Sequence, residues 1–260
     1  MPQSLARAEL ETLLRARQLD RTLTTTLPHQ FSADPLAVAE IGIASLDAVL
    51  GGGFPRGQLS EVIGNRSSGR TSVLLRMLAA ATERGETVAL IDALDMLDVA
   101  SASAAGVDCD RLLWIRGHVV TNPGMCRDMN QRAVDQAIKA LTLVLQAGHF
   151  GVVACDLAEA PREAFRNLPF TTWLRLQRII EASQTACVFL GSESLARSAA
   201  GLTLRLGVQE PMTRDQGPRI RFRGRLFGGL DVRASVVRAR SHVPRQEAVV
   251  ALATVASSHV

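Results

Sequence analysis

Residues 60–81 read SEVIGNRSSGRTSVLLRMLAAA, and this stretch decides the fold. Its first residues are a short apolar run typical of a strand, and its second half has the apolar spacing of a helix. The turn between them, GNRSSGRTS at 64–72, has the spacing G-x-x-x-x-G-[Lys]-[Ser/Thr] of a phosphate-binding loop. It departs from that pattern at one position, because Arg70 stands where the lysine is expected.

The glycines of this turn predict a tight backbone path. Gly64 and Gly69 would let the N–H groups of residues 66–71 converge on an anion at the helix N-terminus. Arg70 keeps the positive charge, but its larger planar guanidinium does not replace a lysine at a close-packed site. The candidate anion-binding loop consists of Gly64, Asn65, Arg66, Ser67, Ser68, Gly69, Arg70 and Thr71.

Short apolar segments alternate with helical segments along the rest of the chain, which predicts an α/β fold. Runs such as VVAC and CVFL are apolar at successive positions, as in strands buried on both faces of a parallel sheet. We expect a doubly wound layer with a mostly parallel sheet. The segments GLTLRLGV, RIRFRGRLF and DVRASVVRAR are expected to be later strands, antiparallel at the sheet edge. The apolar EAVVALATVASS that follows is either a docked segment or a frayed end.

The chain divides by composition into three parts. Residues 1–34 hold an amphipathic helix at about 4–20 and a polar linker, residues 35–210 the α/β core, and residues 211–260 arginine-rich strands and a tail. The first helix either packs on its own core or binds a partner, and the sequence does not favour one over the other.

Composition narrows the class of protein. A chain of 260 residues with 47% apolar content builds a sizeable folded core. It lacks an apolar run of membrane-spanning length and a signal-peptide pattern, so we expect a cytoplasmic protein without a membrane partner. The four cysteines and five histidines have no ligand spacing, and neither a disulfide nor a structural metal is expected.

Basic charge is concentrated near the C-terminus. Lys139 is the single lysine among 29 basic residues. Positions 205–245 hold ten arginines but only three acidic residues. The period of two in RIRFRGRLF puts its arginines on one strand face. This pattern fits a solvated edge strand, which we favour somewhat, or a surface for DNA or a partner. The possible contacts are Arg219, Arg221, Arg223, Arg225, Arg233, Arg238 and Arg240.

The stretch GIASLDAVLGGGFPRGQLSEVIGNRSSGRTS, followed by VALIDALDMLD, GVDCDRLLWIRG and GVVACDL, resembles the RecA family of recombinases over about residues 41–210. The resemblance implies a RecA-like P-loop core. It does not by itself imply recombination, because one fold serves many functions.

Carried over residue by residue, the resemblance places the family's lysine at Arg70 and its magnesium-binding hydroxyl at Thr71. The glutamate that activates water in the family's I-D-A-E falls on Leu94, and the strand-end aspartate survives as Asp156. Because an isobutyl group cannot accept a proton, we expect no ATPase activity. No cofactor is expected, with ATP and Mg²⁺ entering only if the altered loop still binds them.

Two more features of recombinases are reduced here. The γ-phosphate-sensing glutamine of the family falls on Ser192, and the two DNA-contacting loops are shortened, the second to SESLARSAAG. A RecA-like core of this kind, with an N-terminal helix and an arginine-rich end, resembles the ImuA accessory proteins of bacterial SOS mutagenesis. That resemblance implies ImuB and RecA as partners, with DNA and an error-prone polymerase as further ones, and self-association is possible.

Two alternatives stay open. One is a slow ATPase of RecA or KaiC type, in which Asp95 or Asp98 recruits water in place of the missing glutamate. The other is a RecA-like cell-division inhibitor of the SulA kind, which the length and the basic C-terminal segment disfavour.

Overall fold

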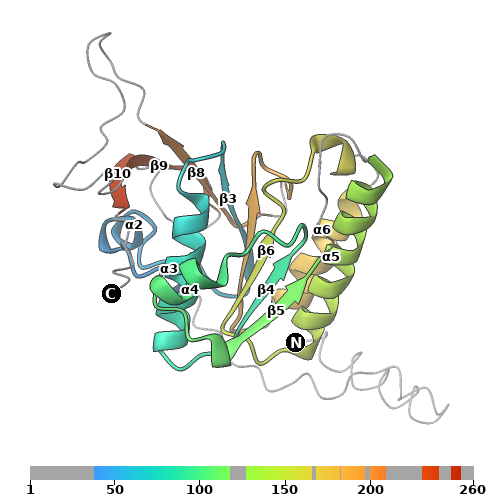
Figure 1. The fold of residues 1–260 in the computed structure, drawn as a ribbon, viewed down its shortest axis with the longest axis horizontal. Helices are drawn as coiled ribbons and strands as arrows, with labels where there is room; N and C mark the ends of the chain where they lie inside the picture. The colour runs from blue at the N-terminus through green and yellow to red at the C-terminus, as the bar shows by residue number, and fades with distance from the viewer. Residues whose placement is uncertain are drawn as a thin grey trace, which may run out of the picture. The chain divides into compact units, whose positions relative to one another are not determined.

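The computed structural model describes residues 38–117, 127–165, 168–181, 183–196, 200–208, 230–239 and 247–252. Eight strands form one sheet with helices on both of its faces (Figure 1). The strands are β3 (Gln58–Gly64), β4 (Val88–Asp92), β5 (Leu112–Arg116), β6 (Val152–Asp156), β7 (Ala186–Gly191), β8 (Leu202–Val208), β9 (Leu230–Ala239) and β10 (Glu247–Leu252). The helices are α2 (Ala44–Val49), α3 (Arg70–Glu83), α4 (Val99–Ala104), α5 (Arg127–Ala147) and α6 (Phe170–Ile180), with short 3-10 turns η2 (Cys109–Arg111) and η3 (Arg162–Phe165).

The strand order β10-β9-β8-β3-β7-β6-β4-β5 confirms the predicted mostly parallel sheet. All pairs from β8 to β5 are parallel, and β9 and β10 are antiparallel additions at one edge. The expectation that the GLTLRLGV strand is antiparallel is wrong, because β8 pairs parallel with β3 and the direction reverses only at β9. The EAVVAL segment is a paired strand, β10, rather than a frayed end.

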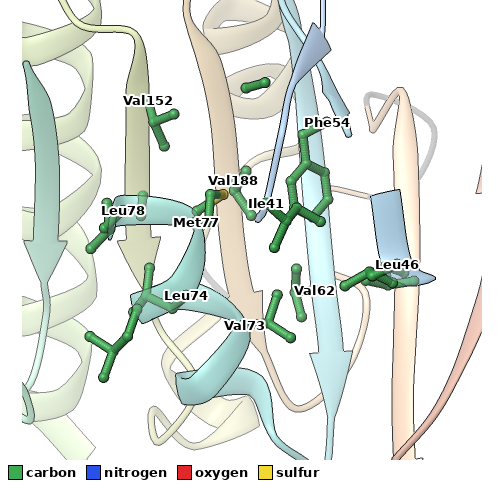
Figure 2. Close-up of a cluster of buried hydrophobic side chains, with 14 of the residues drawn as sticks. Ile41, Leu46, Phe54, Val62, Val73, Leu74, Met77, Leu78, Val152 and Val188 are labelled. Carbon is green, nitrogen blue, oxygen red and sulfur yellow. The ribbon is translucent and has the colours of Figure 1, made fainter. Parts of the chain in front are cut away.

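Helices α2, α3 and α4 cover one face of the sheet and helices α5 and α6 cover the other (Figure 1). On the first face, Met77 and Leu78 of α3 lie with Val188 and Val152 of the strands in a buried apolar cluster (Figure 2). The burial of both faces explains why VVAC and CVFL are apolar at successive positions.

Helix α5 shows how the sequence pattern specifies the second face. Its buried residues Val134, Ile138, Leu141 and Leu145 recur at intervals of four, three and four, which places them on one side of an α-helix. That side packs against the strands with α6, where the ring of Trp173 meets Phe189 of β7 edge to face, at a centroid distance of 5.2 Å.

The glycine triplet before Phe54 leads into a small two-stranded sheet, β1 (Val38–Ala39) with β2 (Phe54–Pro55). Gly51, Gly52 and Gly53 all have positive φ, as a glycine turn requires. A Cβ on Gly53 would lie 2.2 Å from the carbonyl oxygen of Ala39, so this turn admits no side chain at that position.

Some sequence predictions fall outside the described residues. These are the N-terminal helix, the RIRFRGRLF strand with Arg219, Arg221, Arg223 and Arg225, and Arg240. Within the described ranges, none of the helices is both long enough and apolar enough to cross a membrane.

A substitution at Gly64, where β3 ends, tests the close packing of the sheet beneath the loop. A Cβ there would lie 2.5 Å from both the Leu206 carbonyl oxygen and the Ser68 hydroxyl oxygen. We expect Gly64→Ala to lower the free energy of unfolding by about 2 kcal/mol or more, measured by urea denaturation, because backbone must move to relieve the contact. Gly207→Ala is the control, since a Cβ on Gly207 meets nothing within 4 Å. Equal stabilities of the two variants would contradict this packing.

Candidate anion-binding loop and adjoining basic cleft

The predicted loop joins the end of β3 to the start of α3. Gly69 is the residue before the helix and adopts a left-handed backbone with φ of 89°, and Ser67 has φ of 60°. The turn is closed by a hydrogen bond from the Ser68 N–H to the Asn65 carbonyl oxygen at 3.2 Å. Gly69 is therefore needed for its backbone conformation, whereas Gly64 is needed for the close approach of β8.

The guanidinium of Arg70 is buried beside the loop. It lies 3.5 Å from the Ala158 carbonyl oxygen and 3.4 Å from the Glu159 carboxylate. Arg66 donates to the same carboxylate at 2.6 Å. The two loop arginines thus share one acid from the segment after β6, while Thr71 is exposed at the first turn of α3.

Leu94 is 4% exposed and belongs to the apolar cluster under α5 and α6. Its neighbour Asp95 has φ of 57° and directs its carboxylate to Arg116, with both oxygens accepting at 2.8 Å. Arg116 also lies over the ring of Trp114, 4.6 Å from its centroid. Hydrogen bonding by Arg116 lowers the pKa of Asp95 below its ordinary value.

Asp98, the second acid considered as a substitute for the glutamate, caps helix α4. Its carboxylate accepts the Ser101 N–H at 2.9 Å and also the Ser101 hydroxyl. These hydrogen bonds, that of the hydroxyl first, lower the pKa of Asp98. Both acids near Leu94 thus already accept hydrogen bonds from protein groups.

Asp156 ends β6 next to Asp92 of β4, its partner in the strand register. One oxygen of Asp156 accepts the Ala158 N–H at 2.9 Å. Removal from water, reinforced by the negative charge of Asp92, outweighs that hydrogen bond and raises the pKa of Asp156 to about 6. Asp92 accepts hydrogen bonds from the N–H groups of Met96 and Leu97 and from the Trp114 indole.

Glu61, in the middle of β3, has a structural role that sequence reasoning missed. Its buried carboxylate accepts four hydrogen bonds, at 2.6 to 3.1 Å, from the Ser194 hydroxyl, the Leu195 and Ala196 N–H groups and the Thr203 hydroxyl. It therefore fixes the connection after β7, which corresponds to the second DNA-contacting loop of the resemblance. An acid inside the apolar run SEVIG was the available signal, because a buried charge needs partners.

A cleft of about 930 Å³ adjoins the loop on the side of β8 and β9. Arg205 lies opposite Ser235 in the register, and Arg233 lies opposite Gly207, so the two arginines share one sheet face. Both are exposed, and no acidic partner is found for either among the described residues. The residues that line this cleft are Ile63, Gly64, Asn65, Arg66, Ser68, Arg162, Ser192, Glu193, Arg205, Leu206, Gly207, Arg233 and Ser235.

Only some of the residues predicted from the sequence line this cleft. Arg233 and Ser192 line the cleft, whereas Arg238 lies exposed further along β9 and does not line it. Arg205 and Arg162 join the cleft although they were not among the predicted contacts. Arg205 lies 28 positions before Arg233, and only the antiparallel pairing of β8 with β9 places them together.

Comparison with known proteins agrees with this architecture. Residues 24–123 match the family described as the RecA N-terminal domain. The chain is 38% identical over 127 residues to Protein RecA of Saccharopolyspora erythraea, covering 48% of this chain and 33% of the relative. It is 33% identical over 145 residues to Protein RecA of Symbiobacterium thermophilum, covering 55% of this chain and 37% of the relative. The chain spans about a third of the length of these relatives, and the matches and the fold are consistent with a RecA-like core.

The residues present do not fit the ATP and Mg²⁺ that the fold family implies. The cation at the lysine position, Arg70, already lies against Glu159, and the glutamate position is apolar. Asp156, the remaining strand-end acid, already accepts the Ala158 N–H with one of its oxygens. Thr71 is the one group of this set that is exposed and unchanged.

The raised pKa of Asp156 predicts a pH-dependent stability. Its folded pKa lies above the unfolded value, so the folded state binds more protons and stability falls as pH rises from about 4 to 6. Asp156→Asn, which keeps an acceptor for the Ala158 N–H, should raise the free energy of unfolding at pH 8 by about 2 to 3 kcal/mol. The gain should vanish near pH 4 in denaturant titrations. Asp110→Asn, at an exposed acid, should give no such difference, and a gain independent of pH would contradict the assignment.

Proposed function

We propose that this protein is a non-catalytic RecA-like accessory component of the ImuA type, acting in translesion synthesis during the SOS response to DNA damage. One observation carries the proposal: the position that the resemblance assigns to the water-activating glutamate holds Leu94, buried in an apolar cluster. No side chain there accepts a proton, and the two nearby acids are already hydrogen-bonded.

The short connection after β7 supports an accessory role rather than strand exchange. Only ten positions separate Gly191 from Leu202, and Glu61 fixes three of the residues between them. Residues held in this way have little freedom to extend along a DNA strand. The basic cleft and the N-terminal segment are the proposed places of contact with ImuB, RecA filaments or DNA.

Phosphate release is the direct test of this proposal. Purified protein with ATP and Mg²⁺, with and without single-stranded DNA, is expected to release no phosphate above the buffer rate. Asp156→Ala serves as the internal control, because real turnover by a RecA-type or KaiC-type site would depend on this acid. Turnover by the wild type that disappears in Asp156→Ala would overturn the proposal in favour of an active ATPase.

The cleft arginines generate a second prediction, for nucleic-acid binding. Arg205→Ala/Arg233→Ala should weaken binding of a fluorescent single-stranded oligonucleotide about three- to tenfold at low salt, and should lower the salt slope by about 0.7 for each phosphate that is no longer neutralised. Arg175→Ala/Arg178→Ala, which removes the same charge from the exposed side of α6, is the matched control. Equal weakening in both pairs would exclude the cleft as the binding surface.

A pull-down with ImuB separates a protein partner from DNA. Loss of ImuB capture in the cleft variant, with unchanged oligonucleotide binding, would assign the cleft to a protein partner. Point substitutions are the appropriate tool, because β9 and β10 pair into the same sheet as the core. Their deletion would remove buried core residues such as Val232 and Ala234 and would uncover buried residues of β8 such as Leu204.

A further inference from the structure

The two loop arginines converge on a carboxylate from another part of the chain. Glu159 lies three residues after Asp156, and its two oxygens meet Arg66 at 2.6 Å and Arg70 at 3.4 Å. The Arg70 side chain is 7% exposed and that of Glu159 is 20% exposed, so this contact is only partly open to water. The guanidinium groups that would meet an incoming anion are therefore already engaged.

A carboxylate and a phosphate bind an arginine side chain through the same kind of hydrogen bond. Both present negatively charged oxygens that accept hydrogen bonds from the planar guanidinium, and both lack donors when ionised. Glu159 thus supplies to the loop the chemistry that a phosphate oxyanion would supply. It is an anion that belongs to the protein and lies at the loop that its glycines shape for an anion.

The loop also keeps a polar group that the protein does not use. The Ser68 side-chain oxygen is buried, has no hydrogen-bond partner among the described residues, and belongs to a residue that lines the cleft. Buried hydroxyl groups normally have a partner. Its lack of one indicates that the loop is not fully satisfied by Glu159.

We infer that Glu159 is an internal anion that closes the 64–71 loop to polyphosphates, and that removal of this carboxylate opens the loop to them. The ligand class is a pyrophosphate group, free or within a nucleoside triphosphate. The inference deepens the proposed function and rests on it in one respect, namely that binding at this loop is not followed by cleavage.

Calorimetric titration with inorganic pyrophosphate tests the inference, with ATP titrated in a second arm to distinguish the free anion from the nucleotide. Glu159→Gln keeps an acceptor oxygen for Arg70 but removes the charge. We expect it to bind pyrophosphate about tenfold more tightly than the wild type, since two charged donors become available. Tighter binding of ATP alone would contradict the assignment to the polyphosphate group.

Two further variants locate the effect. Asp108 forms an ion pair of 3.4 Å with Arg111, outside the 64–71 loop. Asp108→Asn removes one negative charge beside an arginine there and should leave the pyrophosphate affinity unchanged. Arg66→Ala/Glu159→Gln should lose the gain, because one of the freed donors is gone. Retention of the full gain in this double variant, or an equal gain in Asp108→Asn, would overturn the inference.

The remaining outcomes are also decisive. Unchanged pyrophosphate affinity in Glu159→Gln overturns the inference. Failure of both Glu159→Gln and Glu159→Ala to fold, judged by circular dichroism and Tm with pyrophosphate present, overturns it too, because Glu159 would then be a structural partner that the loop cannot lose. Phosphate release from ATP by the wild type would contradict the proposed function, and it would also contradict closure of the loop by Glu159. Unchanged pyrophosphate affinity in Glu159→Gln, with no phosphate release by the wild type, would overturn the inference alone, so the two failures are distinguishable.

Discussion

The buried carboxylate of Glu61 is the interaction on which much of this structure depends. Strand β3 has parallel neighbours on both sides, so a charge at its centre cannot reach water and must be satisfied by the protein. Four donors from the β7–β8 connection and from β8 meet this requirement. Removing one partner of a buried charge is far more costly than removing one partner of a surface ion pair. One of these bonds, from the Thr203 hydroxyl, joins β3 to β8, the strand on which the antiparallel edge is built.

The loop after β3 also contains a buried charged side chain that needs a partner within the protein. Arg70 is buried and needs an acid, and Glu159 from the segment after β6 provides it. Asp92, Asp95 and Asp98 are similarly engaged by backbone, indole, arginine or hydroxyl groups. Where the resemblance would have acids and a cation directed at a ligand, Arg70 here is directed at Glu159, and the nearby acids accept hydrogen bonds from other protein groups. These charged side chains are thus paired within the protein.

Sequence reasoning could predict the parallel core, because apolar runs such as VVAC are a direct consequence of burial on two faces. It also located the loop, since Gly69 must adopt positive φ. It could not assign Glu159 to Arg70, or Arg205 to the cleft, because these pairs join residues that only the tertiary fold brings together. The direction of β8 was wrong for a related reason: a strand's apolar pattern is the same for either orientation. The sequence left the EAVVAL segment open between a docked segment and a frayed end, because an apolar end segment has no turn signal that defines its partner.

The position of β3 has a consequence for how the chain folds. Its two neighbours, β7 and β8, lie more than a hundred residues later, so its hydrogen bonds close only after most of the chain is in place. Contacts of such long sequence separation slow folding, and they leave an apolar strand with two open edges during synthesis. Newly made protein is therefore at its most aggregation-prone until residues 186–208 have emerged, and helper proteins that shield apolar strands would act in that interval.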